Sequence, residues 1–472
     1  MNRREFLQQS GAAAAVMAGP RVLMAEPQGA MPATMRPAKE KRCFSSAAVE
    51  AKIAEVSRKI ADPQLRWIFE NCYPNTLDTT VRLGELDGGP DTFVITGDIP
   101  AMWLRDSTAQ VTPYAPLLKG DAALQRLFVG LIRRQARCVL LDPYANAFYE
   151  SARMGEHQTD ETEMKPGVHE RKWEIDSLCY PVRLAWTYYK QTGDKTPFDA
   201  AWHEAARLTV HTLRVEQQLN GGSPYHFARN TTSFVDNAPD NGRGNPARKT
   251  GLIHSAFRPS DDACFFPYFI PGNFFAEVAL RQLGWLLREV GGDAALAADC
   301  DAFAGELKAA LEREAVMAHR VAGRIFAFEV DGYGNTLFVD DANAPSLLSL
   351  PYLGCCARNS PTYLRTRKFL LSEENPYFVK GVHSEGVGGP HQGPNRVWPL
   401  AVVMRALTST DDREIGECLK MLVWLSAGSG FMHESAEADR PEHFTRSWFA
   451  WCNSLFGELV VQVAETRPGL LG

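Results

Sequence analysis

The sequence predicts an all-α fold, an (α/α)6 toroid in which helical hairpins surround a central axis. Apolar residues recur with the helical period along most of the chain, in about ten or eleven segments. Between helices, the pair Gly-Asp recurs at Asp121, Asp194 and Asp293. There, glycine is expected to end one helix and aspartate to cap the next. Tight turns of this kind are typical of stacked helical hairpins.

The helices are predicted from apolar stripes. One clear stripe has leucine, phenylalanine and isoleucine at positions 124, 127, 128, 131 and 132, which is the spacing of a single helix face. Similar stripes predict helices over 46–70, 174–192, 197–218, 273–290, 294–316, 361–372, 396–408, 411–427 and 447–463.

Two segments depart from the helical pattern. Residues 92–107, TFVITGDIPAMWLRDS, begin like a strand and end in a polar cluster. Residues 324–354 alternate apolar and polar side chains around Gly332 and Gly334, which predicts a small inserted β-hairpin followed by a long loop. In a helical toroid, long loops of this kind line one mouth of the barrel.

The N-terminal segment is predicted to be a targeting signal. Arg3 and Arg4 precede an Ala-rich apolar run, from about Gly11 to Gly19, that is too short to anchor the chain in a bilayer. This pattern is similar to a twin-arginine export signal. Residues 1–45 are therefore expected to be signal and disordered linker, 46–472 a single domain, and the protein periplasmic or extracellular. The sequence does not indicate an oligomeric state.

Composition excludes several classes of function. The net charge of −6 and the absence of polybasic runs argue against nucleic-acid and lipid partners. The ten cysteines include no C-x-x-C pair, so buried free thiols are expected. His254, His383, His391 and His433 do not have the spacing of a zinc motif. No metal and no cofactor are predicted.

Five clusters of aromatic, arginine and carboxylate residues lie near predicted helix starts, and a toroid would gather these at one end. The clusters are Asp98/Trp103/Arg105/Asp106, Trp173/Glu174/Asp176, His254/Arg258/Asp261/Asp262, His383/Glu385/His391/Gln392/Asn395/Arg396/Trp398, and His433/Glu434/Arg446/Trp448.

Two carboxylates at such a site suggest glycoside hydrolysis, one acting as an acid and the other activating water. Asp261 lies in SAFRPSDDACFFPYFIPGN, where burial among Phe257, Phe265 and Phe266 and the adjacent charge of Asp262 would raise its pKa. Glu434 is the candidate base.

Structural interpretations of the same residues stay open. One of the two adjacent aspartates could cap a helix. Arg105 with Asp106 could be a structural ion pair, and Glu434 could simply pair with an arginine.

Five long motifs, in order, resemble glycoside hydrolase family 125, and the resemblance extends from about residue 50 to about residue 462. These are TGDIPAMWLRDSTAQVTPY (96–114), EIDSLCYP (174–181), SAFRPSDDACFFPYFIPGN (255–273), GVGGPHQGPNRVWPLA (386–401) and FMHESAEADRPEHFTRSWFAWCNSLFGEL (431–459). The resemblance implies an (α/α)6 catalytic domain and a metal-independent exo-α-1,6-mannosidase that inverts configuration. The substrate would be an oligosaccharide or an N-glycan.

The resemblance also implies residue roles. The family's general acid falls on Asp261 and its general base on Glu434, and inversion would place their carboxyl groups about 6.5–9.5 Å apart. Asp262 would bind the sugar or hold the loop. Residues in matched motifs are candidates to bind the sugar hydroxyls or to stack on the ring: Arg105, Asp106, His391, Asn395 and Arg446 for the hydroxyls, Trp103 and Trp398 for the ring.

Three other functions remain as alternatives. A hydrolase of the same fold with another sugar specificity, such as an exo-glucosidase, would share the mechanism. A sugar epimerase or isomerase would use histidines across the barrel, with His254 opposite His391 or His433. A sugar-binding protein without activity would not need both carboxylates, and both are present.

Overall fold

The computed structural model describes residues 33–472, and Thr34–Gly472 form one compact unit. The predicted export signal lies mainly outside the described residues, so export remains a prediction. The folded unit begins earlier than the predicted boundary at residue 46. Arg36 contacts Asp78 at 2.7 Å and Glu50 at 3.0 Å, and the Met35 amide donates to Asn71 at 2.9 Å. Ion pairs and hydrogen bonds hold this segment in place, and such contacts produce no periodic pattern of apolar residues in the sequence.

Helices dominate the described unit, as predicted, and the fold is of the (α/α)6 class. Those of eight residues or more are α1 (Ala47–Ser57), α2 (Pro63–Cys72), α4 (Leu104–Val111), α5 (Ala122–Leu141), α6 (Ile175–Thr192), α7 (Ala200–Val215), α9 (Ile270–Val290), α10 (Ala294–Glu314), α11 (Pro361–Leu370), α12 (Pro399–Thr408), α13 (Asp412–Leu425) and α14 (Ala450–Thr466). Two shorter helices are α3 (Asn75–Thr79) and α8 (Pro239–Gly242).

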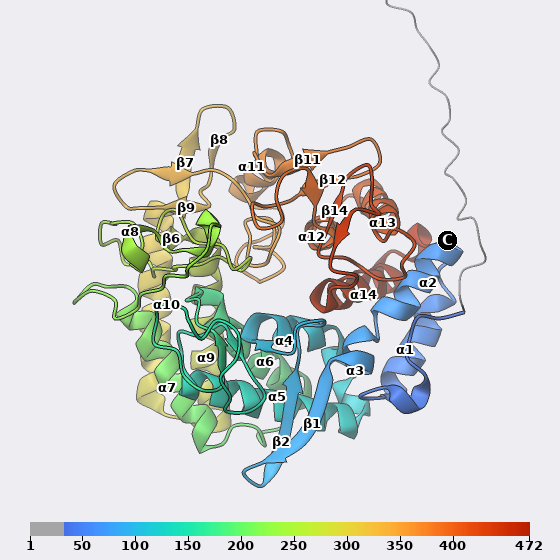
Figure 1. Ribbon diagram of the computed structural model, residues 1–472, viewed down its shortest axis with the longest axis horizontal. Helices are drawn as coiled ribbons and strands as arrows, with labels where there is room; N and C mark the ends of the chain where they lie inside the picture. Colours follow the sequence, from blue (N-terminus) through green and yellow to red (C-terminus); the bar gives the residue numbers. More distant parts are fainter. Residues whose placement is uncertain (1–32) are drawn as a thin grey trace, which may run out of the picture. The chain divides into compact units, whose positions relative to one another are not determined.

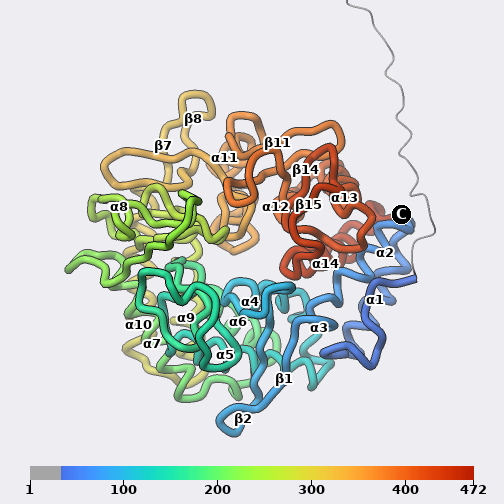
Figure 2. Tube along the Cα trace, in the orientation of Figure 1, coloured from blue at the N-terminus to red at the C-terminus, as the bar shows by residue number. Residues whose placement is uncertain are grey.

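Five of these helices form the inner side of a ring (Figure 1). They contact one another in the order α12, α14, α4, α6, α9, while α13, α5, α7 and α10 pack outside them. The Cα trace in Figure 2 shows α14 beside α2 and α3, and the Ala61 amide donates to the Leu471 carbonyl at 2.6 Å. The last helix therefore packs against the first ones and closes this part of the ring.

A segment of successive turns, residues 346–354, stands between the outer helices α10 and α11. It is largely buried. Tyr352 in this segment donates to Glu458 of α14 at 2.9 Å, and Tyr363 of α11 donates to the Leu348 carbonyl at 2.9 Å. Pro345 and Pro351 interrupt helical hydrogen bonding here. This turn segment is thus hydrogen-bonded to both α14 and α11.

Most predicted helices are present, with local differences. The stripe over 46–70 is divided into α1 and α2, because Asp62 caps a new helix with Pro63 at its first position. Asp121 and Asp293 cap α5 and α10 as predicted. Asp194 does not cap a helix: it accepts from the Thr196 amide in a turn, and Asp199 caps α7.

The strands are short and pair antiparallel. They are β1 (Val81–Leu86), β2 (Gly89–Val94), β3 (Met102–Trp103), β4 (Ala147–Phe148), β5 (Val168–Glu170), β6 (Tyr268–Phe269), β7 (Val316–His319), β8 (Gly323–Phe326), β9 (Glu329–Val330), β10 (Thr336–Leu337), β11 (Phe378–Lys380), β12 (Glu385–Val387), β13 (Arg396–Val397), β14 (Ser435–Glu437) and β15 (Phe444–Thr445). The predicted hairpin around Gly332 and Gly334 is β9–β10, and β8 pairs back with β7 instead.

Three small sheets lie at the N-terminal ends of inner helices. Their strand orders are β3-β4-β5, β10-β9-β6 and β13-β14-β15. The strand β3 leads directly into α4, β6 into α9, and β13 into α12, while β5 and β15 precede α6 and α14 by a few residues. Side chains that follow these strands are therefore held near the inner helix N-termini. The ten cysteines are free thiols, as predicted, but only seven are buried: Cys355 and Cys356 are half-buried and Cys43 is exposed.

Candidate active site

A cavity of about 330 Å³ lies at the end of the helical ring where the inner helices begin. Its lining comes from five separate parts of the chain: four precede or begin an inner helix, and the fifth is Asn343 in the segment after β10. The lining residues are Thr96, Ile99, Trp103, Arg105, Asp106, Pro259, Ser260, Asp261, Asn343, His391, Gln392, Trp398, Glu434, Thr445, Arg446, Phe449 and Trp451. The volume is at the small end of the range for ligand pockets, which suits a single compact unit such as one monosaccharide.

Eight of the ten predicted site residues line this cavity: Trp103, Arg105, Asp106, Asp261, His391, Trp398, Glu434 and Arg446. Two do not. Asn395 is exposed in a left-handed turn with φ of 59°. Asp262 is buried outside the lining.

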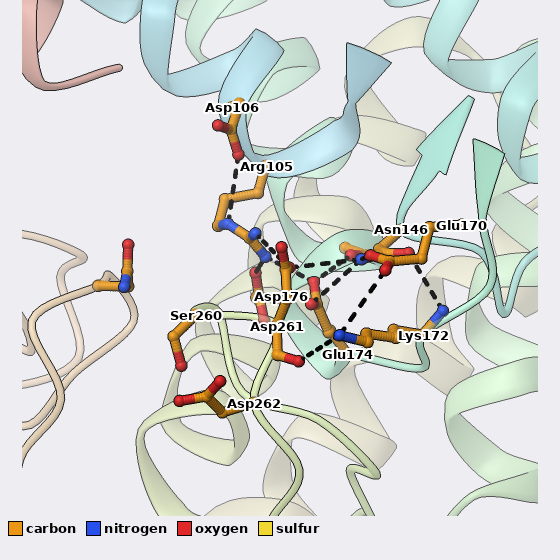
Figure 3. Close-up of polar contacts among 12 residues, drawn as sticks. Arg105, Asp106, Asn146, Glu170, Lys172, Glu174, Asp176, Ser260, Asp261 and Asp262 are labelled. Atoms are coloured by element: carbon orange, nitrogen blue, oxygen red, sulfur yellow. Dashed lines mark hydrogen bonds and ion pairs between the residues drawn. The ribbon is translucent and has the colours of Figure 1, made fainter. Parts of the chain in front are cut away.

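The adjacent aspartates point in different directions (Figure 3). Asp261 has a left-handed backbone, φ 67°, and its carboxyl group faces Arg105. Asp262 instead accepts a hydrogen bond from His391 Nδ1 at 2.9 Å. Neither aspartate caps a helix, since α9 begins at Ile270. Asp262 thus positions a side chain of the cavity wall.

The loop that carries both aspartates is fixed by buried polar contacts. Glu329 of β9 accepts from Arg258 at 2.7 Å and from the Phe265 and Phe266 amides at 2.9 Å. Ser260 donates to Asp341 at 2.7 Å. Such fully hydrogen-bonded buried groups hold a loop in one conformation.

Arg105 is the centre of a buried charge cluster (Figure 3). Its Nη1 lies 2.5 Å from Glu174 and 3.3 Å from Asp176, and its Nη2 lies 3.1 Å from Asp261. The neighbouring Asp106 lies 3.4 Å from Nε. One guanidinium therefore faces four carboxyl groups.

These surroundings change the predicted electrostatics of Asp261. Burial raises its pKa, but the charge of Arg105, a hydrogen bond with Glu174 and the charge of Lys172 together lower the pKa below the usual value. The sequence predicted a raised pKa from an apolar pocket. That prediction was wrong because it lacked Arg105, Glu174 and Lys172, whose combined effect outweighs burial; in addition, Phe265 is exposed and Asp262 turns away.

The other carboxyls of the cluster shift the opposite way. Burial is the main cause, and it raises the pKa of Glu174 well above its ordinary value even though Arg105 opposes it. Burial likewise raises the pKa of Asp106 and that of Asp176 to about 6. The cluster therefore retains protons at mildly acidic pH.

Glu434 lies in a simpler environment. Thr445 donates to its Oε2 at 3.1 Å, and Arg446 Nη1 lies 3.6 Å from Oε1. Arg446 is itself held by Asp98 and by the Thr96 carbonyl, to which it donates at 2.8 Å. A buried carboxylate with a cation and a hydroxyl donor suits a base that activates water.

Several polar atoms of cavity residues are buried without a hydrogen-bond partner among residues 33–472. They are the indole Nε1 of Trp103 and of Trp398, Thr96 Oγ1 and Arg446 Nε, while Arg105 Nε and Asp106 Oδ2 have only their 3.4 Å ion-pair contact with each other. Buried polar groups are normally paired. A ligand rich in hydroxyl groups would satisfy such a mixture of donors and acceptors.

Sequence reasoning missed some residues of the site. Asn146 contacts Glu170, Glu174 and Asp261, and Lys172 donates to the Asp261 carbonyl at 2.7 Å. A buried lysine between two glutamates in the segment ERKWE, residues 170–174, was an available signal.

The histidines do not form a pair across the cavity. Only His391 of the three candidates lines it. Burial opposes the charge on His391, but Asp262 outweighs burial and raises its pKa to about 9, so the ring is a cation at neutral pH. Burial lowers the pKa of His254 to about 4, and His433 is buried against backbone carbonyls. This arrangement does not suit the epimerase alternative.

Among residues 33–472, one group of side chains could together hold a metal ion: Glu156, His157 and His169. None of the three lines the cavity. His169 packs edge-on against Trp103, with ring centroids 5.2 Å apart.

Comparisons with known proteins identify the family. Residues 62–461 match the model of the metal-independent α-mannosidases, family GH125. This chain belongs to that family. It is 43% identical over 455 residues to the meiotically up-regulated gene 157 protein of Schizosaccharomyces pombe, covering 92% of this chain and 89% of the yeast protein.

A solved structure agrees with the assignment. The metal-independent α-mannosidase of Streptococcus pneumoniae, in a non-productive complex with α-1,6-mannobiose, is 41% identical and superposes with a TM-score of 0.86. The match covers 90% of this chain and all of that one. The GH125 protein described here is therefore a glycoside hydrolase, an α-mannosidase, and the predicted family is confirmed. None of its described helices has the length and apolar character needed to cross a membrane.

Proposed function

We propose that this enzyme releases mannose from the non-reducing ends of α-1,6-linked mannosides with inversion of configuration. Asp261 acts as the general acid and Glu434 as the general base. The observation that carries the proposal is that both carboxyls line one small cavity whose buried donors and acceptors are not all used within the chain. The α-1,6 linkage is supported by the mannobiose bound to the related Streptococcus pneumoniae enzyme.

The mechanism follows from two carboxyl groups at one sugar. Asp261 gives its proton to the glycosidic oxygen as the bond between this oxygen and C1 breaks. Glu434 takes a proton from a water molecule whose oxygen attacks C1 from the opposite face. The α-mannoside is thereby converted to β-mannose. Inversion requires about 6.5–9.5 Å between the two carboxyl groups, so that the water fits.

The remaining cavity residues bind the sugar in this proposal. Trp103 and Trp398 offer indole N–H donors and apolar faces on which a sugar ring stacks. Asp106, Arg446 and the protonated His391 offer charged partners for hydroxyl groups. A small pocket with these groups suits a terminal mannose of an oligosaccharide or N-glycan.

The decisive experiment is proton NMR of the reaction on α-1,6-mannobiose, with EDTA present. β-Mannose should appear first and then mutarotate. Asp261→Asn and Glu434→Gln should each lower kcat by about 10²–10⁴-fold, while the control Glu417→Gln, at an exposed carboxyl of α13, should be unaffected. Initial α-mannose would refute the inverting mechanism, and release of a different sugar only would refute the specificity.

We also propose that the chain is exported by the twin-arginine route, on the basis of the Arg3–Arg4 pair and the apolar run after it. Arg3→Lys combined with Arg4→Lys should retain the enzyme in the cytoplasmic fraction of the producing cell. Equal distribution of variant and parent between cell fractions would refute the proposal.

A further inference from the structure

The charge cluster at Arg105 contains more carboxyl groups than cations to neutralise them. Glu174, Asp176, Asp106 and Asp261 all lie within 3.4 Å of the guanidinium. Glu174 and Asp176 have no exposed side-chain surface. Buried like charges at this separation cannot all be ionised, so the cluster must hold at least one proton.

Two carboxyls of the cluster are bridged by the same donors. Arg105 contacts Glu174 through Nη1 and Asp261 through Nη2. The Asn146 amide lies 3.3 Å from Glu174 Oε1 and 3.4 Å from Asp261 Oδ1. The two carboxyl groups also act on each other: Asp261 contributes to the raised pKa of Glu174, and Glu174 to the lowered pKa of Asp261. A hydrogen bond between two carboxyls needs one proton, because two carboxylates have only acceptors.

We propose that Glu174 and Asp261 hold one proton between them, and that Glu174 keeps this proton available to Asp261 at neutral pH. The inference rests on the proposed role of Asp261 as the acid. Glu174 is at the N-cap position of α6, where its side chain makes no capping hydrogen bond, and it does not line the cavity. It therefore acts through Asp261 and is a positioning residue. Such a pair titrates as a unit in two steps.

The proton balance of one turnover is simple. The proton on Asp261 moves to the glycosidic oxygen as the C1–O bond breaks, which leaves both carboxyls ionised. Glu434 takes one proton from the attacking water. Solvent then returns one proton to the Glu174–Asp261 pair, and Glu434 releases its proton to solvent. No group other than water and these three carboxyls is needed.

The pair resolves a conflict in the site. An isolated acid at Asp261 would be ionised at neutral pH, since the surrounding charges hold its pKa below the usual value. Glu174 has the opposite shift, a pKa well above the usual value, mainly because it is buried. With the proton held jointly, Asp261 can donate at a pH where its own carboxyl alone could not.

The test is the pH profile of kcat/KM on α-1,6-mannobiose for Glu174→Gln. The amide oxygen can still accept from Arg105 and Ser177, whereas the bond that Oε1 accepts from Asn146 is lost together with the second acid. The alkaline limb of the profile should shift to lower pH by at least one unit, so that kcat/KM falls at least tenfold at pH values above the limb. Activity should recover toward acid pH. Glu174→Asp should lie between the two profiles. Glu216→Gln, at another buried carboxyl with a raised pKa, should leave the profile unchanged.

A second substrate separates this role from a structural one. A dinitrophenyl α-mannoside has a leaving group that needs no proton, so Glu174→Gln should retain near-parental kcat on it. An equal loss on both substrates at every pH, or an unmoved alkaline limb in Glu174→Gln and Glu174→Asp, would overturn the inference. If Asp261→Asn remains active on mannobiose, the proposed acid itself is wrong, which is a different outcome.

Discussion

Replacement of Asp262 by Asn should remove a positive charge from the cavity wall at neutral pH. His391 Nδ1 lies 2.9 Å from Asp262, whose side chain is 1% exposed. Burial alone would lower the pKa of His391, but the carboxylate of Asp262 more than offsets burial and raises the pKa to about 9. Asparagine offers a hydrogen-bond acceptor without the charge, so burial should then dominate.

The size of the effect follows from the shift. The change from the ordinary 6.5 to about 9 is roughly 2.5 pH units, or about 3.4 kcal/mol in favour of the charged ring. Because the His391 side chain is 28% exposed, solvent screening reduces this to about 2 kcal/mol. The folded-state pKa is raised, so this stabilisation is complete below about pH 6.5 and is lost as the pH rises through about 9.

The assay is an NMR titration with ¹³C-labelled histidine, in which His391→Gln assigns the resonance. The parent should titrate near pH 9 and Asp262→Asn at or below 6.5. Glu437→Gln, at the half-buried partner of the exposed His443, is the matched control and should leave His391 unchanged. A parental His391 that titrates near 6.5, or one that keeps its pKa in Asp262→Asn, would refute the reasoning.

Two further predictions concern the fold and are measured by thermal unfolding. Gly130→Ala in α5 should lower the free energy of unfolding by about 1–3 kcal/mol, since a Cβ there would lie 2.9 Å from the Thr92 amide nitrogen. Gly305→Ala on the open face of α10 should instead raise it by about 0.5–1 kcal/mol, and equal effects of the two variants would contradict this packing. Arg36→Ala should cost about 1.5–3 kcal/mol because it deprives the buried Asp78 carboxyl of its bidentate partner, and an unchanged melting temperature would show that residues 34–45 do not support the domain.

The helical framework could be predicted because each helix has its own apolar stripe. The stripe of α5 and the caps at Asp121 and Asp293 are local signals, and the structure has them where they were expected. The prediction that Asp194 caps a helix was wrong, because a Gly-Asp pair specifies a turn but not how soon the next helix follows. Here Asp199 provides the cap. The start at residue 34 depends on Arg36 contacts with residues far along the chain.

The sequence predicted which residues line the site better than it predicted their pKa values. Motifs place Asp261 at the cavity, but its partner Arg105 is 156 residues away, and no local pattern reports that contact. The left-handed backbone at Asp261 sends its carboxyl and that of Asp262 in different directions. Adjacent residues therefore have different roles. Asn395 shares a motif with cavity residues, but its backbone is also left-handed and its side chain is exposed.

The fold itself accounts for how two similar carboxyl groups could take opposite roles. Every inner helix presents its N-terminus to the cavity side, and helix N-termini favour negative charge. Glu174 is at the N-cap position of α6, while Asp106 and Asp176 lie in first turns, so carboxyls crowd on the Arg105 side and must share protons there. Glu434 enters from another part of the ring, beside the Arg446 cation and the Thr445 hydroxyl donor. The crowded carboxyls on the Arg105 side would thus provide the acid, and Glu434, which lies apart from them, would provide the base.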